Sequence, residues 1–158
     1  MKVLGIIDED LINYKVPSMV IEMPYCNFKC DKECGRQVCQ NSALAKAPVL
    51  DMAPAEILQR YIDNDITSAL VLQGLEPFDS WDELVVLCTL FRMISNDPIV
   101  IYTGYNRKEI ERKVKILQDN CSNFIIKYGR YVPDQPPHLD PLLGVYLSSP
   151  NQYAVYYD

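Results

Sequence analysis

The chain has 158 residues, 49% of them hydrophobic, so it can bury one sizeable core but is too short for two. We therefore expect a single domain over residues 1–158. The formal net charge is -6. This acidic balance argues against a nucleic-acid or anionic-membrane surface, because such binding depends on lysine and arginine side chains that neutralise phosphate groups.

The N-terminal stretch "MKVLGIIDEDLINYK" does not resemble a targeting signal. Asp8, Glu9 and Asp10 interrupt its short apolar run, so it lacks the long apolar region of a signal peptide. No other stretch approaches the roughly 20 apolar residues of a membrane span. These patterns predict a cytoplasmic protein with no membrane partner. In that compartment thiols stay reduced, and clustered cysteines more often bind metal than form disulfides.

Strand and helix patterns alternate along the chain. Short β-branched and apolar runs predict strands, and apolar residues at helical spacing predict helices. In chain order we expect a strand at 18–23, a helix at 53–65, a strand at 66–74, a helix at 79–97, a strand at 98–105, a helix at 106–119, a strand at 122–129 and a final pair of short strands at 144–149 and 152–158. The alternation predicts an α/β fold with a mostly parallel sheet, whose ligands lie beyond the carboxyl ends of the strands.

Residues outside this pattern are assigned structural roles. The Pro-rich stretch 132–141 is expected to be a loop, and His138, the only histidine, is expected to have a surface or cap role within it. Cys88 lies inside the apolar pattern of a predicted helix, which indicates a core residue. Cys121 falls between a predicted helix and strand and is not expected to bind metal.

The loop "CNFKCDKECGRQVCQN" holds four of the six cysteines and follows the first predicted strand. Gaps of three, three and four residues separate Cys26, Cys30, Cys34 and Cys39. Thiolates at such spacings can converge on tetrahedral zinc or on an iron–sulfur cluster. Structural zinc usually uses Cys-x-x-Cys pairs, and this loop has none. The spacing therefore favours a cluster and leaves zinc, a disulfide or mere coincidence open.

The order of motifs resembles the radical S-adenosylmethionine (SAM) superfamily. The chain is most similar to the small activating enzymes of anaerobic ribonucleotide reductase, over roughly residues 15–155. Two departures from that family are a longer cysteine loop than Cys-x-x-x-Cys-x-x-Cys and Leu75 in place of a second glycine. The similar features are Cys26-x-x-x-Cys30, "VCQN" (38–41), "QGLEP" (73–77), "TGY" (103–105) and "SSPNQ" (148–152).

The resemblance implies a compact partial (βα) barrel that binds a [4Fe–4S] cluster and SAM. It also implies an activase that generates a glycyl radical on a partner, anaerobic ribonucleoside-triphosphate reductase, with a reducing donor such as flavodoxin or ferredoxin. One alternative is a radical SAM enzyme that acts on a small molecule or peptide. Another is a non-catalytic zinc or iron–sulfur binding module, because Leu75 alters the turn nearest SAM.

In such enzymes three thiolates hold the cluster and leave one iron open for the amino and carboxylate groups of SAM. The implied ligands are Cys26, Cys30 and Cys39. Cys39 stands in "VCQN" as the third cysteine of the activating enzymes does. Residues 31–38 would then form an inserted bulge that holds Cys34 away from the iron. A longer loop is tolerated because its closure entropy grows only logarithmically with length.

The resemblance further implies a SAM site of six residues and no separate catalytic side chain. Gly74 would leave room for the ligand, and Glu76 or nearby backbone carbonyls would accept from the SAM ammonium group. Thr103 and Tyr105 would meet the ribose, and two C-terminal residues would line the adenine side. The full set is Gly74, Glu76, Thr103, Tyr105, Ser148 and Asn151.

Overall fold

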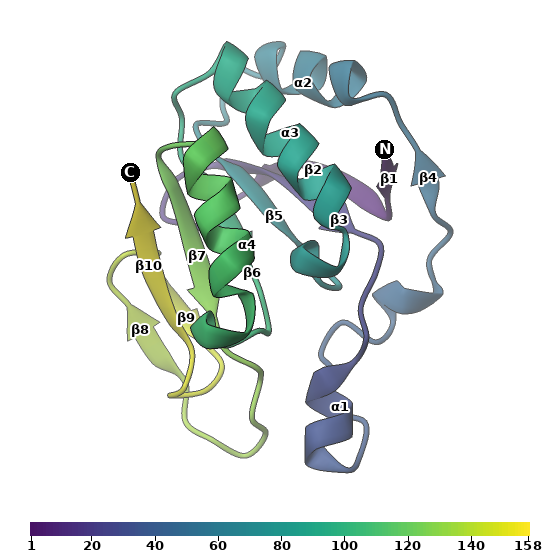
Figure 1. Cartoon of the computed structure of the whole chain (residues 1–158), viewed down its shortest axis with the longest axis vertical. Coiled ribbons are helices and arrows are strands. Elements are labelled where there is room, and N and C mark those ends of the chain that lie inside the picture. Colours follow the sequence, from purple (N-terminus) through teal and green to yellow (C-terminus); the bar gives the residue numbers. More distant parts are fainter.

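The computed structural model describes residues 1–158 and contains a six-stranded mixed sheet (Figure 1). The sheet order is β10-β7-β6-β5-β3-β2. The four central strands β3, β5, β6 and β7 run parallel, and β2 and β10 pair antiparallel at the two edges. The strands are β2 Gly5–Asp10, β3 Ser18–Met23, β5 Leu70–Gly74, β6 Ile99–Tyr102, β7 Phe124–Tyr128 and β10 Tyr153–Tyr157.

Two small antiparallel sheets accompany the large one. β1 Lys2–Val3 pairs with β4 Leu50–Asp51, and β8 His138–Asp140 pairs with β9 Val145–Leu147. None of the helices combines the length and apolar character that crossing a membrane requires. The helices are α1 Lys29–Cys34, α2 Pro54–Ile62, α3 Trp81–Ile94 and α4 Arg107–Asn120, with 3-10 turns at Leu44–Lys46 and Pro77–Asp79.

Two of the helix starts carry familiar sequence signals. The Asn106 side chain accepts from the Glu109 backbone N–H, and the Glu109 side chain accepts from the Asn106 backbone N–H. This reciprocal capping box satisfies donors that the first turn of α4 would otherwise leave free. α2 has Pro54 as its first residue, where the missing N–H is harmless.

Alternate residues of the parallel strands enter two different cores, because successive side chains of a strand point to opposite faces. Helices α2, α3 and α4 all pack against one face, where Ile21, Leu72 and Ile101 lie in the larger core. Cys88 and Cys121 are buried in that core too, which confirms the prediction for Cys88.

The opposite face of the sheet is covered by other parts of the chain. Val20, Val71 and Val100 point to this face. Tyr14, from the loop after β2, and Leu147 of β9 pack against them. The helices thus cover one face of the parallel strands, and the loop after β2 and the β8–β9 pair cover the other.

Several predictions about the ends of the chain were wrong. The stretches 144–149 and 152–158 contain β9 and β10, but these do not pair with each other: β9 pairs with β8, and β10 pairs with β7. The stretch 132–141, expected to be a loop, contains β8. The N-terminal strands β1 and β2 were not predicted, because charged residues interrupt the alternation of "GIIDED".

The parallel strands follow one another in sequence order, and their connecting helices all lie on one face. Barrels of (βα) units are built in this way. Strand order alone does not establish the curvature of a sheet, so the partial (βα) barrel stays a prediction, as does the single domain over residues 1–158.

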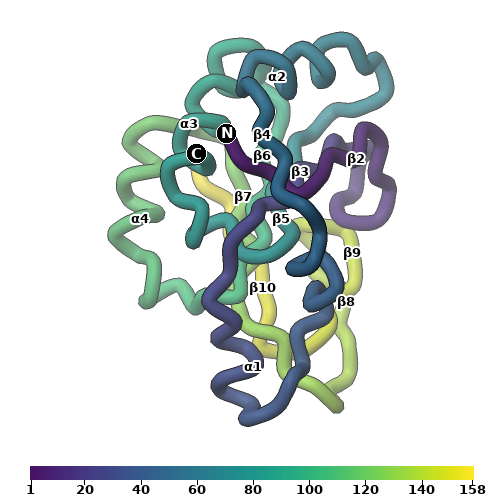
Figure 2. The backbone as a smooth tube through the Cα atoms, turned by 90° about the vertical axis from the view of Figure 1, so that its right-hand side faces the viewer, coloured from purple at the N-terminus to yellow at the C-terminus, as the bar shows by residue number.

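The cysteine segment lies outside the two cores. No residue from 25 to 50 is buried. α1 lies at one end of the molecule, and the chain then returns past the sheet to β4 (Figures 1 and 2). Contacts other than core packing must therefore determine where the thiols lie.

Candidate metal centre and ligand cavity

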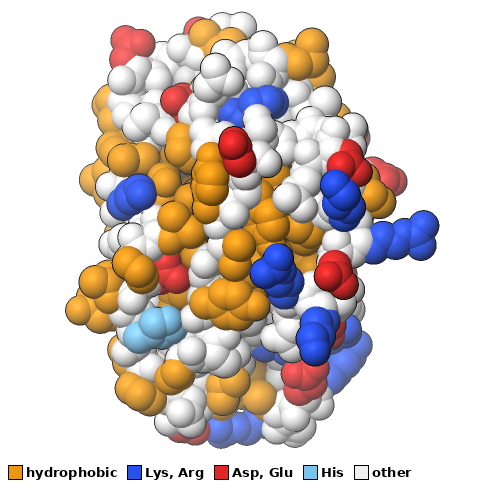
Figure 3. Space-filling model, turned by 60° about the vertical axis from the view of Figure 1, so that its left-hand side comes forward, with side chains coloured by type: hydrophobic (Ala, Val, Ile, Leu, Met, Phe, Trp, Pro, Cys, Tyr) orange, Lys and Arg blue, Asp and Glu red, His pale blue; other side chains and the backbone are white.

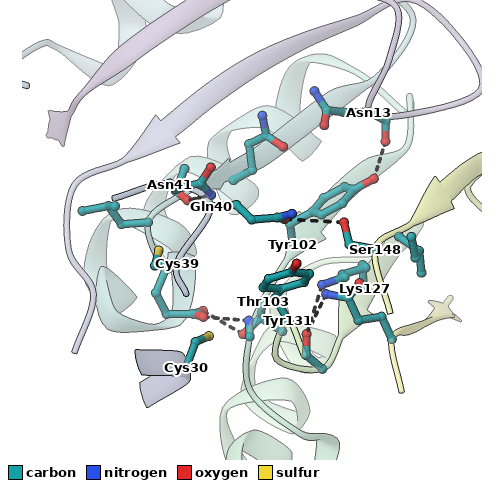
Figure 4. Close-up of a pocket in the computed structure, with 18 of the residues that line it drawn as sticks. Asn13, Cys30, Cys39, Gln40, Asn41, Tyr102, Thr103, Lys127, Tyr131 and Ser148 are labelled. Atoms are coloured by element: carbon teal, nitrogen blue, oxygen red, sulfur yellow. Dashed lines mark hydrogen bonds between the residues drawn. The ribbon is translucent and has the colours of Figure 1, made fainter. Parts of the chain in front are cut away.

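A cavity of about 320 Å³ lies at the carboxyl ends of the parallel strands (Figure 4). Gln73, Tyr102 and Lys127, from β5, β6 and β7, line it. Asn13 lines it from the loop after β2, and Ser148 lines it from the segment after β9. Its volume is at the lower end of the range for small-ligand sites, roughly 300–1,000 Å³.

Three of the four clustered cysteines line this cavity. They are Cys26, Cys30 and Cys39, which come from two separate parts of the cysteine segment. Cys34 is exposed at the end of α1 and does not line the cavity. The structure thus groups the three predicted cluster ligands and separates the fourth thiol from them. Their role as ligands stays a prediction.

The arrangement of the thiols differs from that of a site for one ion. No three His, Cys, Asp or Glu side chains stand close enough together to hold a single metal ion. Tetrahedral zinc needs all its thiolate sulfurs at about 2.3 Å from one centre. A four-iron cluster binds each thiolate through a different iron, so its ligands stand farther apart. The three thiols therefore share a cavity but do not form a ready-made site for one ion.

The thiols nearest the strand ends are in a partly dry environment. Burial raises the pKa of Cys26 to about 12 and also raises the pKa of Cys30. The Phe28 backbone N–H donates to Cys26 Sγ at 3.2 Å, which partly offsets the effect on the Cys26 pKa. Both thiols are protonated at neutral pH in the metal-free chain, so metal binding must displace their protons.

Glu76 lines the cavity as predicted, but its carboxylate already has partners within the chain. The Thr103 hydroxyl donates to Oε1 at 2.7 Å, and the Gly104 backbone N–H donates to Oε2 at 2.9 Å. The Phe78 N–H also donates to Oε1. Burial raises the Glu76 pKa to about 7, and these hydrogen bonds oppose that rise. Glu76 thus joins the ends of β5 and β6, and its contact with SAM stays a prediction.

Replacing Glu76 with Ala should lower the free energy of unfolding by about 1–3 kcal/mol, because the buried Thr103 hydroxyl and the partly buried Gly104 N–H lose their acceptor. Urea unfolding of the metal-free protein measures this. We also expect weaker SAM binding with unchanged iron content. Unchanged stability would contradict the joining role, and an equal loss of iron would show that Glu76 builds the site without contacting SAM.

Thr103 and Tyr105, both expected to meet the ribose, line two different spaces. Thr103 lines the main cavity, whereas Tyr105 lines a neighbouring space of about 20 Å³. The Tyr105 hydroxyl donates to Asp79 Oδ1 at 2.6 Å and accepts from Asn27 Nδ2 at 2.7 Å. Tyr105 therefore ties the cysteine segment to the turn after β5, a role that the sequence did not suggest.

Gly74 has a left-handed backbone, with φ at 98°. A Cβ at this position would lie 2.8 Å from the backbone nitrogen of Met23 on the neighbouring strand β3. The close approach of the two strands therefore requires glycine here. Gly74 also lines the cavity, and its role in leaving room for the ligand stays a prediction. The Gly74 carbonyl accepts from Asn41 Nδ2 at 2.7 Å, which attaches the "VCQN" motif to this strand end.

The C-terminal motif "SSPNQ" contributes two residues to the cavity, Ser148 and Gln152. Asn151, which we had expected on the adenine side, does not line the cavity and instead donates to the Arg130 carbonyl at 2.8 Å. Gln152 is buried and donates to the Gly129 carbonyl at 3.3 Å. The motif thus brings Ser148 and Gln152, but not Asn151, to the cavity lining, and the contact with adenine stays a prediction.

Lys127 is the main cavity residue that sequence analysis missed. It is only 7% exposed, and its Nζ donates to the Gly129 carbonyl at 3.1 Å. Burial lowers its pKa to about 8, although the charges of Glu76 and Cys30 act in the opposite direction. A lysine within the apolar strand "FIIKY" is a signal that could have found it, because a lysine is rarely buried without a polar or charged partner.

Comparison with known families bears on the same part of the chain. Residues 18–144 match a family described as a 4Fe-4S single cluster domain. No curated protein and no solved structure matches the chain significantly. The matched range runs from β3 to the turn before β9, so it includes the four parallel strands and the whole cysteine segment. Because this match covers most of the sequence, the chain belongs to the 4Fe-4S single cluster domain family.

Proposed function

We propose that this 4Fe–4S domain is a radical SAM activase. It binds one cluster through Cys26, Cys30 and Cys39, and it binds SAM in the adjoining cavity. Its substrate is a larger partner of the anaerobic ribonucleotide reductase type, on which it generates a glycyl radical. The observation that carries this proposal is that three of the clustered thiols, and not the fourth, line a cavity of small-ligand size.

Three protein ligands leave one iron of a four-iron cluster free for SAM, whereas four would close the site. A cluster held by Cys26, Cys30 and Cys39 would supply one-electron reductive cleavage of SAM, with the electron from a donor such as flavodoxin or ferredoxin, and so the hydrogen abstraction that makes a glycyl radical on the partner. The protein binds and orients the reactants and excludes water from the cavity.

Polar side chains on the cavity lining could bind the polar groups of SAM. The cationic Nζ of Lys127 has one hydrogen bond to a protein acceptor and can donate to a carboxylate as well. Gln73 and Ser148 offer further polar groups on the lining. These side chains complement a ligand that has a carboxylate, a ribose and an adenine.

The size and rim of the cavity favour a protein substrate over a small molecule. A cavity of about 320 Å³ leaves little room for a second small molecule beside SAM. Ile12 and Tyr146 both line the cavity and are 77% and 72% exposed. Apolar side chains in such positions are common where a protein partner docks.

The exposed apolar surface extends beyond the rim. Leu139, Tyr153 and Tyr156, on β8 and β10, are all exposed. Figure 3 shows hydrophobic side chains around His138 on the face that carries these strands. A partner that covers the cavity mouth could extend its contact over this face.

The test is anaerobic purification followed by reconstitution with iron and sulfide. We expect about four irons per chain, a reducible cluster signal that SAM perturbs, and release of 5′-deoxyadenosine under reduction. About one zinc per chain, with no effect of SAM, would refute the proposed enzyme activity. A glycyl radical signal on an added partner supports the activase, and deoxyadenosine release that a small molecule stimulates would favour the alternative substrate class.

A further inference from the structure

No residue from 25 to 50 is fully buried, so the hydrophobic cores do not hold Cys39 in place and polar contacts contribute to its position. α1 has six residues, none of them buried, and its cap residue Phe28 makes no side-chain capping bond. A helix of this length is not stable by itself in water. Lys29 Nζ and Glu109 pair at 3.1 Å and hold the start of α1 against α4.

Asp31 connects this helix to the returning chain. Its Oδ1 accepts from the backbone N–H groups of Val38 and Cys39, each at 2.8 Å. These bonds close the inserted residues 31–38 into a loop whose two ends lie together. Asp31 is adjacent in sequence to Cys30, so one carboxylate links the helix turn of one cluster thiol to the backbone of another.

The residues after Cys39 have their own attachments. Gln40 Oε1 accepts from Ser148 Oγ at 3.4 Å, and Asn41 is bonded to the Gly74 carbonyl. Neither contact involves Cys39 itself. Asp31 is the only side chain that hydrogen-bonds the Cys39 backbone.

We infer that Asp31 is a positioning residue for the third cluster thiol: its carboxylate oxygen holds the Cys39 backbone so that the thiol faces the cavity shared with Cys26 and Cys30. The inference rests on the ligand set of the proposed function. It explains how a chain with a lengthened cysteine loop returns its last thiol to the site while Cys34 stays exposed.

The relevant property of Asp31 is an oxygen acceptor, because both N–H groups donate to the same atom, Oδ1. Asn keeps such an oxygen, and Ala does not. Asp31→Ala should therefore no longer hold the Cys39 backbone in position, and Asp31→Asn should still hold it for the most part. Glu33→Ala is a matched control, because Glu33 is an acidic residue of the same helix that pairs with Arg130 and does not contact Cys39.

The first measurement uses cluster-free, reduced protein, in which the alkylation rate of each cysteine is followed by mass spectrometry. Asp31→Ala should raise the rate at Cys39 by about tenfold and leave the rates at Cys26 and Cys30 unchanged. Asp31→Asn and Glu33→Ala should behave like the unmodified chain. The second measurement is the iron concentration required for cluster assembly, which Asp31→Ala should raise by about 10–100-fold, as loss of a group that orients a ligand does.

Unchanged Cys39 alkylation and normal assembly in Asp31→Ala would overturn the inference. Equal exposure of all the cavity thiols would overturn it as well, because Asp31 would then be a general structural residue. Failure of the ligand set is a separate result: a Cys39→Ser protein that still assembles a SAM-cleaving cluster refutes Cys39 as a ligand, whatever alkylation of Asp31→Ala shows.

Discussion

Single serine substitutions of Cys26, Cys30 and Cys39 should each abolish assembly of a SAM-cleaving cluster, whereas Cys34→Ser should retain it. The thiols of Cys26, Cys30 and Cys39 line the cavity, whereas Cys34 is exposed on α1. A serine hydroxyl is a much poorer ligand for cluster iron than a thiolate, so the loss of one of three thiolates should leave the cluster too weakly held to assemble. Iron content, the reduced-cluster spectrum and 5′-deoxyadenosine release measure the effect.

Cys34→Ser is the internal control, because it makes the same chemical change within the same loop. A cluster that survives Cys39→Ser and collapses with Cys34→Ser would reverse the assignment of the third ligand. Loss of the cluster in all four variants would indicate a closed four-thiolate site and would argue against radical chemistry.

Lys127→Met should weaken SAM binding by about tenfold or more, because a charge-assisted hydrogen bond contributes roughly 1.5–3 kcal/mol. The same variant should keep its iron, since the change removes no thiol. It should be at least as stable as the unmodified chain, because methionine fills a similar volume without a buried charge, and burial already lowers the Lys127 pKa to about 8. SAM titration and thermal unfolding measure the two effects.

Lys113→Met is a suitable control for this experiment. Lys113 Nζ donates to the Phe78 carbonyl and lies 5.2 Å from the centre of the Trp81 ring, and the residue does not line the cavity. SAM affinity should be unchanged in this variant. Unchanged SAM affinity in Lys127→Met would refute the carboxylate contact, and a marked loss of stability would show that Lys127 supports the fold.

The central elements of the fold could be predicted because local pattern determines them. The predicted strand at 18–23 coincides with β3 Ser18–Met23, and the helix predicted at 106–119 coincides closely with α4 Arg107–Asn120. Such strands are continuous apolar runs because both of their faces are buried, and the helix shows its apolar stripe and its cap in the sequence.

The candidate site was predictable in part. The order of motifs placed Cys26, Cys30 and Glu76 at strand ends, and the structure brings all three to one cavity. Asn151 and Tyr105 were expected in the same site and do not line that cavity. Neighbouring residues of a motif can point in different directions, so a motif identifies a segment more securely than it identifies the side chain that faces the ligand.

The sequence by itself determined that strands and helices alternate and that the clustered thiols suit metal, because periodicity and residue chemistry are local properties. Only the tertiary structure decided that β10 pairs with β7 and that β9 pairs with β8, since pairing depends on which strand edges remain free. It also decided that Lys127 lines the cavity and that Asp31 accepts a hydrogen bond from the backbone of Cys39, which lines the same cavity. Both outcomes depend on contacts between residues whose relative positions are set by the packing of the whole sheet or by closure of a loop.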